Sequence, residues 1–149
     1  MTKPVAIVTG ASRGVGKAVA LLLAEKGWNL TLTCSSSLKE AKKVAKECND
    51  LGSETIVLTA DVSDESKCKE TVQKTIEEWK RLDVLINNAG KTVFNAHENL
   101  AGLKSEDFLE IYKTNTVGPY MMIKEAEDDE SKAAESSVID NGPDGEEKM

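Results

Sequence analysis

A glycine-rich segment near the start of the chain constrains the fold more than any other feature. The segment Thr9–Gly16, TGASRGVG, follows the apolar run Pro4–Val8 and precedes the amphipathic stretch Lys17–Lys26. A strand, a glycine turn and a helix in this order create a cradle for phosphate, because the first N–H groups of a helix are unpaired and lie at the positive end of its dipole. Glycines also let the backbone turn sharply and approach a pyrophosphate. The segment therefore predicts a dinucleotide-binding unit.

The alternation of apolar runs and amphipathic stretches continues along the chain. Further strands are expected at 30–34, 55–60 and 83–86, with helix caps at Ser37, Ser63 and Ser105. The last helix is expected to run to about residue 124 with a bend at Gly118-Pro119. This pattern predicts an α/β fold, a Rossmann-like doubly wound parallel sheet that is incomplete, with about four strands. The short run Ser137–Asp140 is the candidate for a fifth strand, although the charges and turn formers around it favour its absence.

The charge distribution divides the chain into two parts. Residues 124–149 contain ten acidic residues and three lysines, whereas residues 1–123 contain sixteen residues of each sign. We expect a domain over residues 1–123 and an acidic, frayed or disordered tail over residues 124–149. Neither part is basic, so no nucleic-acid partner is expected. No stretch is apolar enough to span a membrane and no signal pattern precedes Val5, which predicts a cytoplasmic protein.

The cysteines and the histidine do not form a recognisable ligand set. Cys34, Cys48 and Cys68 are widely spaced and odd in number, which is typical of free thiols in a reducing compartment. With His97 as the single histidine, no metal site is expected.

Candidate nucleotide-binding residues follow each expected strand, where open α/β sheets bind ligands. The second strand ends in serines, without the Asp or Glu that would bind a free ribose 2′-hydroxyl, and Arg13 can donate a charge-assisted fork to a 2′-phosphate. NADP is therefore favoured over NAD, although Ser37 is explained more readily as a helix cap. Asp61 suits an adenine contact and a plain turn equally well. The candidate cofactor residues are Gly10, Ser12, Arg13, Gly14, Val15, Gly16, Ser35, Ser36, Asp61, Val62, Asn88, Ala89 and Gly90.

These motifs resemble those of the classical short-chain dehydrogenase/reductase family, in the NADP-using branch that includes oxoacyl-carrier-protein reductases. The matching stretches cover residues 3 to about 124 and are Thr9-Gly10-x-x-x-Gly14-x-Gly16, Asp61-Val62, Leu82–Gly90 and Asn115-x-x-Gly118. The resemblance implies that the glycines cradle the pyrophosphate, that Asp61 and Val62 border adenine, and that Asn88 and Ala89 line the ribose. It also implies a catalytic-site asparagine at Asn115 and hydride transfer between nicotinamide and a small carbonyl or alcohol substrate.

The family's other catalytic residues are a Ser and a Tyr-x-x-x-Lys pair that follow the asparagine by several tens of residues. In this chain the Tyr-x-x-x-Lys spacing occurs at Tyr120 and Lys124, five residues after Asn115 on the same expected helix. We expect Tyr120 to pack under the sheet and Lys124 to reach solvent. The serines at 136 and 137 lie at the start of the candidate fifth strand rather than after it. No catalytic Ser, Tyr or Lys transfers from the family to this chain.

Three interpretations of the sequence stay open. The first is an NADP-dependent carbonyl–alcohol oxidoreductase with little or no turnover on its own. The second is a non-catalytic NADP-binding or interaction module, and the third is a truncated product without a function. An incomplete sheet leaves an exposed edge and uncovered helix faces, so homo- or hetero-oligomers are expected through them.

Overall fold

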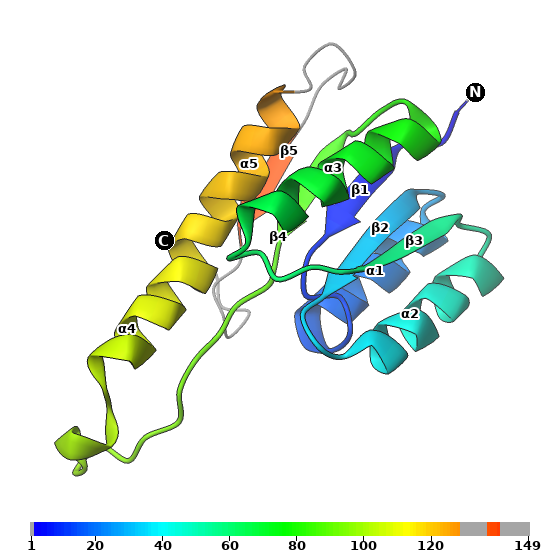
Figure 1. Cartoon of the computed structure of the whole chain (residues 1–149). Helices are drawn as coiled ribbons and strands as arrows, with labels where there is room; N and C mark the ends of the chain where they lie inside the picture. Colours follow the sequence, from blue (N-terminus) through cyan, green and yellow to red (C-terminus); the bar gives the residue numbers. More distant parts are fainter. Residues whose placement is uncertain (1, 129–136, 141–149) are drawn as a thin grey trace.

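Five parallel strands form one sheet in the computed structural model, which describes residues 2–128 and 137–140 (Figure 1). The strands are β1 (Val5–Val8), β2 (Asn29–Cys34), β3 (Thr55–Thr59), β4 (Val84–Asn87) and β5 (Ser137–Asp140), in the spatial order β3-β2-β1-β4-β5. The helices are α1 (Gly14–Glu25), α2 (Leu38–Asp50), α3 (Glu65–Trp79), the 3-10 turn η1 (Leu100–Gly102), α4 (Ser105–Tyr112), the π-helical turn η2 (Lys113–Val117) and α5 (Gly118–Asp128). The strand order reverses between β1 and β4, which confirms the Rossmann-like, doubly wound fold.

The fifth strand corrects the expectation of four. Ser137–Asp140 pairs in parallel with β4, with Val84 opposite Ser137 and Asn87 opposite Asp140. Backbone hydrogen bonds to β4 stabilise this short strand. The amino-acid composition around the strand does not indicate such pairing, which is why the sequence favoured its absence. The expected boundary between residues 123 and 124 falls inside α5, which continues to Asp128. Apart from β5, the expected tail beyond Asp128 lies outside the described residues.

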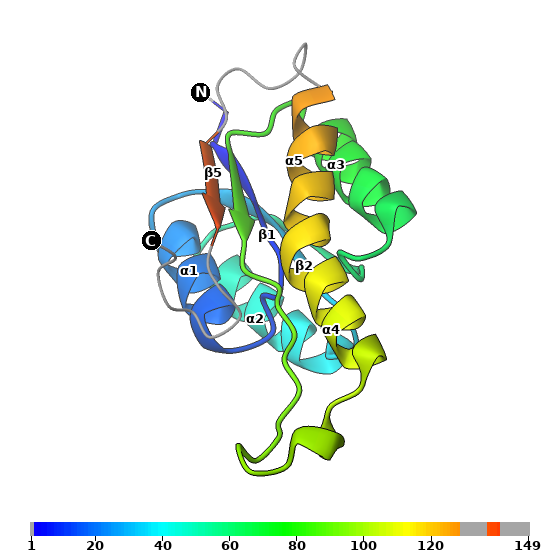
Figure 2. The ribbon, with the colours of Figure 1, turned by 90° about the vertical axis from the view of Figure 1, so that its left-hand side faces the viewer.

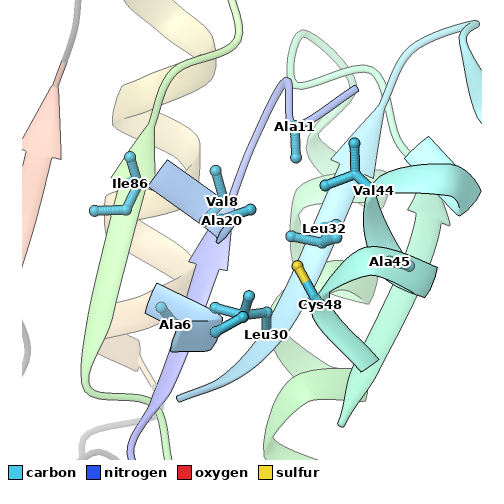
Figure 3. Packing of buried hydrophobic residues seen from close by; sticks show 11 residues of the cluster. Ala6, Val8, Ala11, Ala20, Leu30, Leu32, Val44, Ala45, Cys48 and Ile86 are labelled. Carbon is cyan, nitrogen blue, oxygen red and sulfur yellow. The ribbon is translucent and has the colours of Figure 1, made fainter. Parts of the chain in front are cut away.

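Helices cover both faces of the sheet, with α1 and α2 on one face and α3 and α5 on the other (Figure 2). Strand alternation directs Ala6 and Val8 of β1 into the core under α1 and α2, and Ile7 into the core under α3 and α5. Both faces of β1 are therefore buried, which explains its uninterrupted apolar run. In the first of these cores, shown in Figure 3, the neighbouring strands and helices contribute Leu30, Leu32, Ile86, Ala20, Val44, Ala45 and Cys48.

Two predicted helix caps are formed differently in the structure. Ser37 precedes α2, but its hydroxyl makes no capping hydrogen bond. Before α3 the capping residue is Asp64, whose carboxylate accepts a hydrogen bond of 3.0 Å from the Ser66 N–H. Ser63, the expected cap, instead donates to Asp61. Asp64 is one residue closer to α3 than Ser63, and its carboxylate is also stabilised by the positive end of the helix dipole. Asp64 therefore caps α3 in place of Ser63.

The segments α4, η2 and α5 follow one another without a break. The sequence predicted a bend at Gly118-Pro119, but the irregular turn is η2, which ends immediately before Gly118. Ser105 is the first helical residue rather than the cap, because the Asp107 carboxylate accepts from the Lys104 N–H at 2.9 Å. Figure 2 shows α4 and the segment before it extending away from the sheet. Within the described ranges no helix combines the length and apolar composition of a membrane span.

Candidate cofactor site

A cavity of about 750 Å³ opens at the carboxyl ends of β1, β2, β3 and β4. Its walls come from the loop between β1 and α1, the ends of β2 and β3, the segment after β4, and the α4–η2 helix. The predicted cofactor residues that line it are Gly10, Ser12, Arg13, Gly14, Val15, Ser35, Asp61, Val62, Asn88, Ala89 and Gly90. Gly16 and Ser36 do not line the cavity. Residues from four separate loops therefore share one cavity, which is where an open α/β sheet binds a ligand.

The floor of the cavity depends on two close approaches of backbone. Gly10 has φ +63°, and a Cβ there would lie 2.9 Å from the Cα of Ala89. A Cβ on Gly16 would fall on the carbonyl oxygen of Gly10 and lie 2.5 Å from the Asn88 Nδ2. Gly16 therefore acts behind the cavity, where it lets α1 begin directly against the glycine loop. Because Gly16 packs against Gly10 and Asn88, it does not line the cavity.

A network of hydrogen bonds fixes the glycine loop to the segment after β4. The Asn88 amide donates from Nδ2 to the Gly10 carbonyl at 2.9 Å. The Thr9 hydroxyl, which is buried, accepts from the backbone N–H groups of Asn88 and Ala89, both at 3.0 Å. This role of Thr9 was not predicted from the sequence. Its position at the end of β1, opposite the end of β4, was the available signal.

One corner of the cavity is formed by Arg13 and the residues after β2. The Arg13 guanidinium donates from Nη2 to the Ser37 hydroxyl at 2.9 Å. Ser37, explained from the sequence as a cap, is thus a hydrogen-bond partner of Arg13 instead. Cys34 and Ser35 complete this corner, and burial raises the pKa of the Cys34 thiol. Among the described lining residues, the carboxylates are those of Asp61, which follows β3, and Glu110 of α4. Neither belongs to the segment directly after β2.

Asp61 and Val62 combine local and cavity-facing roles. The Asp61 Oδ1 accepts from the backbone N–H and the hydroxyl of Ser63, at 2.9 and 2.7 Å, which is the turn interaction considered from the sequence. The residue also lines the cavity, so both of its proposed uses are compatible with the geometry. Val62 is 5% exposed, and its carbonyl accepts from the buried Cys68 thiol at 3.2 Å. Val62 is mainly a core residue whose edge reaches the cavity wall.

Asn115 lies just outside the cavity and binds the backbone of Lys91. Its Oδ1 accepts from the Lys91 N–H at 2.6 Å, and its Nδ2 donates to the Lys91 carbonyl at 2.7 Å. This pair of bonds joins η2 to the segment that follows β4. Both ends of the amide are therefore engaged with backbone in this structure.

The Tyr-x-x-x-Lys spacing at Tyr120 and Lys124 lies away from the cavity. Tyr120 is 64% exposed, so the expectation that it packs under the sheet is wrong; Met122, two residues on, is the buried side chain. Helical geometry explains the difference, because two residues along a helix turn a side chain to nearly the opposite face. Lys124 is half exposed and forms an ion pair of 3.1 Å with Glu65 of α3. Neither Tyr120 nor Lys124 lines the cavity.

A doubly wound parallel sheet with a glycine-lined cavity at its strand ends defines a dinucleotide-binding α/β protein. The model of the short chain dehydrogenase family matches residues 4–140. The chain belongs to this family, whose members include oxidoreductases that use a nicotinamide cofactor.

Individual relatives support the same assignment. The chain is 36% identical over 126 residues to the 3-oxoacyl-(acyl-carrier-protein) reductase FabG of Staphylococcus aureus, which covers 85% of this chain and 50% of that protein. The structure of an alcohol dehydrogenase from Thermococcus sibiricus complexed with 5-hydroxy-NADP has a TM-score of 0.79 and 32% identity, over 91% of this chain and 57% of that one. A short chain dehydrogenase from Burkholderia cenocepacia in complex with NADP has a TM-score of 0.79 and 29% identity, over 85% of this chain and 51% of that one. The chain spans about half the length of the curated relatives it matches.

Proposed function

We propose that this chain binds NADP(H) in preference to NAD(H), with little or no turnover on its own. The observation that carries the proposal is the hydrogen bond between Arg13 and Ser37 at the corner of the cavity. A guanidinium and a hydroxyl together suit a phosphate monoester, because both can donate hydrogen bonds to its oxygens. A carboxylate directly after β2 would repel a 2′-phosphate, and none of the described residues that line this corner is acidic. Glu40 of α2, whose charge acts on Cys34, does not line the cavity.

The rest of the cavity fits the common part of both cofactors. The glycine loop brings backbone to the cavity floor at a place that a Cβ on Gly10 would fill. The first turn of α1 directs unpaired N–H groups toward the same loop, which is the general basis for binding a pyrophosphate. Asp61 remains the candidate for adenine, since the Oδ1 that binds Ser63 leaves its second oxygen available. Bound nicotinamide would supply hydride transfer to or from a carbonyl or alcohol substrate.

The position of the Tyr-x-x-x-Lys pair in the described part of the chain supports low turnover. General acid–base catalysis typically contributes about 10²–10⁴-fold to rate, and it needs the acid within hydrogen-bond reach of the substrate. Tyr120 and Lys124 do not line the cavity, and Lys124 is paired with Glu65. Both ends of the Asn115 amide bind the backbone of Lys91. These bonds favour a positioning role for Asn115 over a catalytic one. Of the two remaining interpretations, the cavity supports the cofactor-binding module.

Fluorescence titration of NADPH and NADH into the purified chain tests the proposal. NADPH should bind more tightly, and Arg13→Met should reduce its affinity to that of NADH while leaving NADH unchanged. Arg13→Lys should restore only part of the preference, because lysine lacks the planar fork. Lys42→Met, which removes an exposed charge on α2 outside the cavity, is the matched control.

Each outcome of the titration bears on a separate part of the proposal. If neither cofactor binds, both the cofactor-binding module and the enzyme interpretation fail for this chain. Equal affinities would refute the assignment of Arg13 and Ser37 to a 2′-phosphate. Rapid NADPH oxidation with a carbonyl substrate, abolished by Tyr120→Phe, would refute the low turnover.

The oligomeric state stays a prediction with a simple test. On α4, Phe108, Leu109 and Tyr112 are 62%, 68% and 59% exposed. Apolar side chains grouped on one surface favour association. Sedimentation velocity should detect dimers or larger species, and Leu109→Glu should shift the population toward monomer. A concentration-independent monomer for the unmodified chain would contradict the expectation.

A further inference from the structure

Lys91 extends the cationic side of the cavity in a way that none of the recognised motifs requires. It follows Gly90 directly and lines the cavity together with Glu110 of α4. The Lys91 Nζ donates to the Glu110 Oε2 at 2.6 Å, and the two side chains are 46% and 61% exposed. The pair is thus in contact with solvent in the cavity and is not part of the core.

The origin of the Lys91 side chain is fixed. Asn115 binds both the N–H and the carbonyl of Lys91, so the backbone at this residue is held from both sides. Two residues earlier, Ala89 lies against Gly10, where an added Cβ would be 2.9 Å from the Ala89 Cα. Two trans peptide steps span about 7 Å at most. The four-carbon stem of a lysine at this distance can reach the mouth of the glycine loop.

The described residues that line the cavity carry one more positive than negative charge. The described lining residues include three cations, Arg13, Lys91 and Lys113, and two carboxylates, Asp61 and Glu110. The Glu110 carboxylate raises the pKa of the Lys91 ammonium through its hydrogen bond and its charge, and the charges of Asp61 and Asp107 raise it less. Lys91 therefore remains charged at neutral pH. Arg13 is hydrogen-bonded to Ser37 beside β2, whereas Lys91 follows β4 on the other side of β1, so the cavity offers a phosphate at the glycine loop a second, separate cation.

We propose that Lys91 is a second cationic ligand of the dinucleotide, that it binds the pyrophosphate, and that Glu110 competes with the pyrophosphate for it. The inference rests on the proposed cofactor function of the same cavity. When the dinucleotide enters, the Lys91 ammonium exchanges the Glu110 carboxylate for a phosphate oxygen. The pyrophosphate is common to NADPH and NADH, so Lys91 affects both cofactors equally, in contrast to Arg13.

The two basic residues can be distinguished by the pattern of affinities. Lys91→Met should weaken NADPH and NADH by similar factors of about tenfold, the size expected for one charge-assisted hydrogen bond. Glu110→Gln should tighten both by a few-fold, because the competing charge is removed. Lys91→Arg should retain most of the affinity. Inorganic pyrophosphate should displace NADH from the unmodified chain more effectively than from Lys91→Met.

The chain provides a matched control pair in Lys124 and Glu65. Their side chains are 45% and 58% exposed, close to the values for Lys91 and Glu110. Their ion pair measures 3.1 Å, and neither residue lines the cavity. Lys124→Met and Glu65→Gln should leave both affinities unchanged. Thermal unfolding of every variant separates loss of binding from loss of folding.

The outcomes distinguish this inference from the proposed function. If the unmodified chain binds NADPH but Lys91→Met binds it equally well at an unchanged Tm, the Lys91–Glu110 pair is structural and the inference is wrong. A selective loss of NADPH would assign Lys91 to the 2′-phosphate and overturn its assignment to the pyrophosphate. Weaker binding by Glu110→Gln would overturn the competition. If the unmodified chain binds neither cofactor, the proposed function itself fails.

Discussion

Replacing Gly16 with alanine sets two physical effects against each other. In an unobstructed helix interior the change from glycine to alanine stabilises by about 0.5–1 kcal/mol. In α1 the new Cβ would fall on the Gly10 carbonyl oxygen and lie 2.5 Å from the Asn88 Nδ2. The backbone oxygen cannot rotate away as a side chain can, so the loop must move and the 2.9 Å bond from Asn88 to Gly10 is lost. Overpacking costs about 1–3 kcal/mol and the hydrogen bond about 1 kcal/mol, so we expect a net loss of about 1–3 kcal/mol.

Gly14→Ala is the matched control for this prediction. Gly14 has φ +58° and no atom within 4 Å of an added Cβ, so its cost is the left-handed backbone alone, about 1–2 kcal/mol. Urea unfolding followed by circular dichroism measures both variants, and NADPH titration reports on the loop. Gly16→Ala should lose cofactor binding because it displaces the floor of the cavity, whereas Gly14→Ala should keep more of it. A Gly16→Ala variant as stable as the unmodified chain, or more so, would refute the close approach of α1 to the glycine loop.

Two further predictions concern stability and reactivity. Asp83→Asn should lower the free energy of unfolding by about 2–3 kcal/mol, because its carboxylate accepts from the Val5 N–H at 2.8 Å and from two Arg81 nitrogens at 2.8 and 2.7 Å. Burial opposes ionisation of Asp83, but the hydrogen bonds from Arg81 and Val5 outweigh it and lower the pKa, so this stabilisation should be complete above about pH 4 and lost as the pH falls through the folded-state pKa. An acid-unfolding midpoint unchanged by Asp83→Asn would contradict this. Burial raises the pKa of Cys48 to about 11 and that of Cys68 to about 12, so both thiols should react with a thiol reagent at pH 8 only after denaturant is added; prompt labelling of the native chain would show that they are accessible.

The parts of the fold that could be predicted from the sequence have local causes. The run Val5–Val8 indicated a strand buried on both faces, and the glycines after it indicated the turn into α1. The alternation of strands and helices then left few topologies, because parallel strands need crossovers of one hand. The candidate residues Asp61 and Asn88 could be placed at one edge for the same reason, although their roles toward a cofactor remain predictions.

The features that could not be predicted depend on which partner is nearest in space. The sequence around Ser37 fits a helix cap, but Arg13, 24 residues earlier, takes its hydroxyl. Tyr120 and Met122 are both suited to the core, and the rotation of α5 relative to the sheet decides between them. The ion pair between Lys91 and Glu110 was not expected, because the two residues are 19 positions apart and the π-helical turn after α4 has no clear signal in composition.

The central position of β1 has a consequence for synthesis of the chain. Its two neighbours are made at very different times, since Val5 pairs with Asn29 of β2, whereas Ala6 pairs with Val84 of β4. A ribosome that adds about 5–20 residues per second completes β4 about 4–16 s after β1. During that interval the most apolar strand of the sheet has one unpaired edge, which other nascent chains can pair with. The nascent polypeptide is therefore most prone to aggregate between the emergence of β3 and that of β4, and slower translation of this interval should lower the soluble yield.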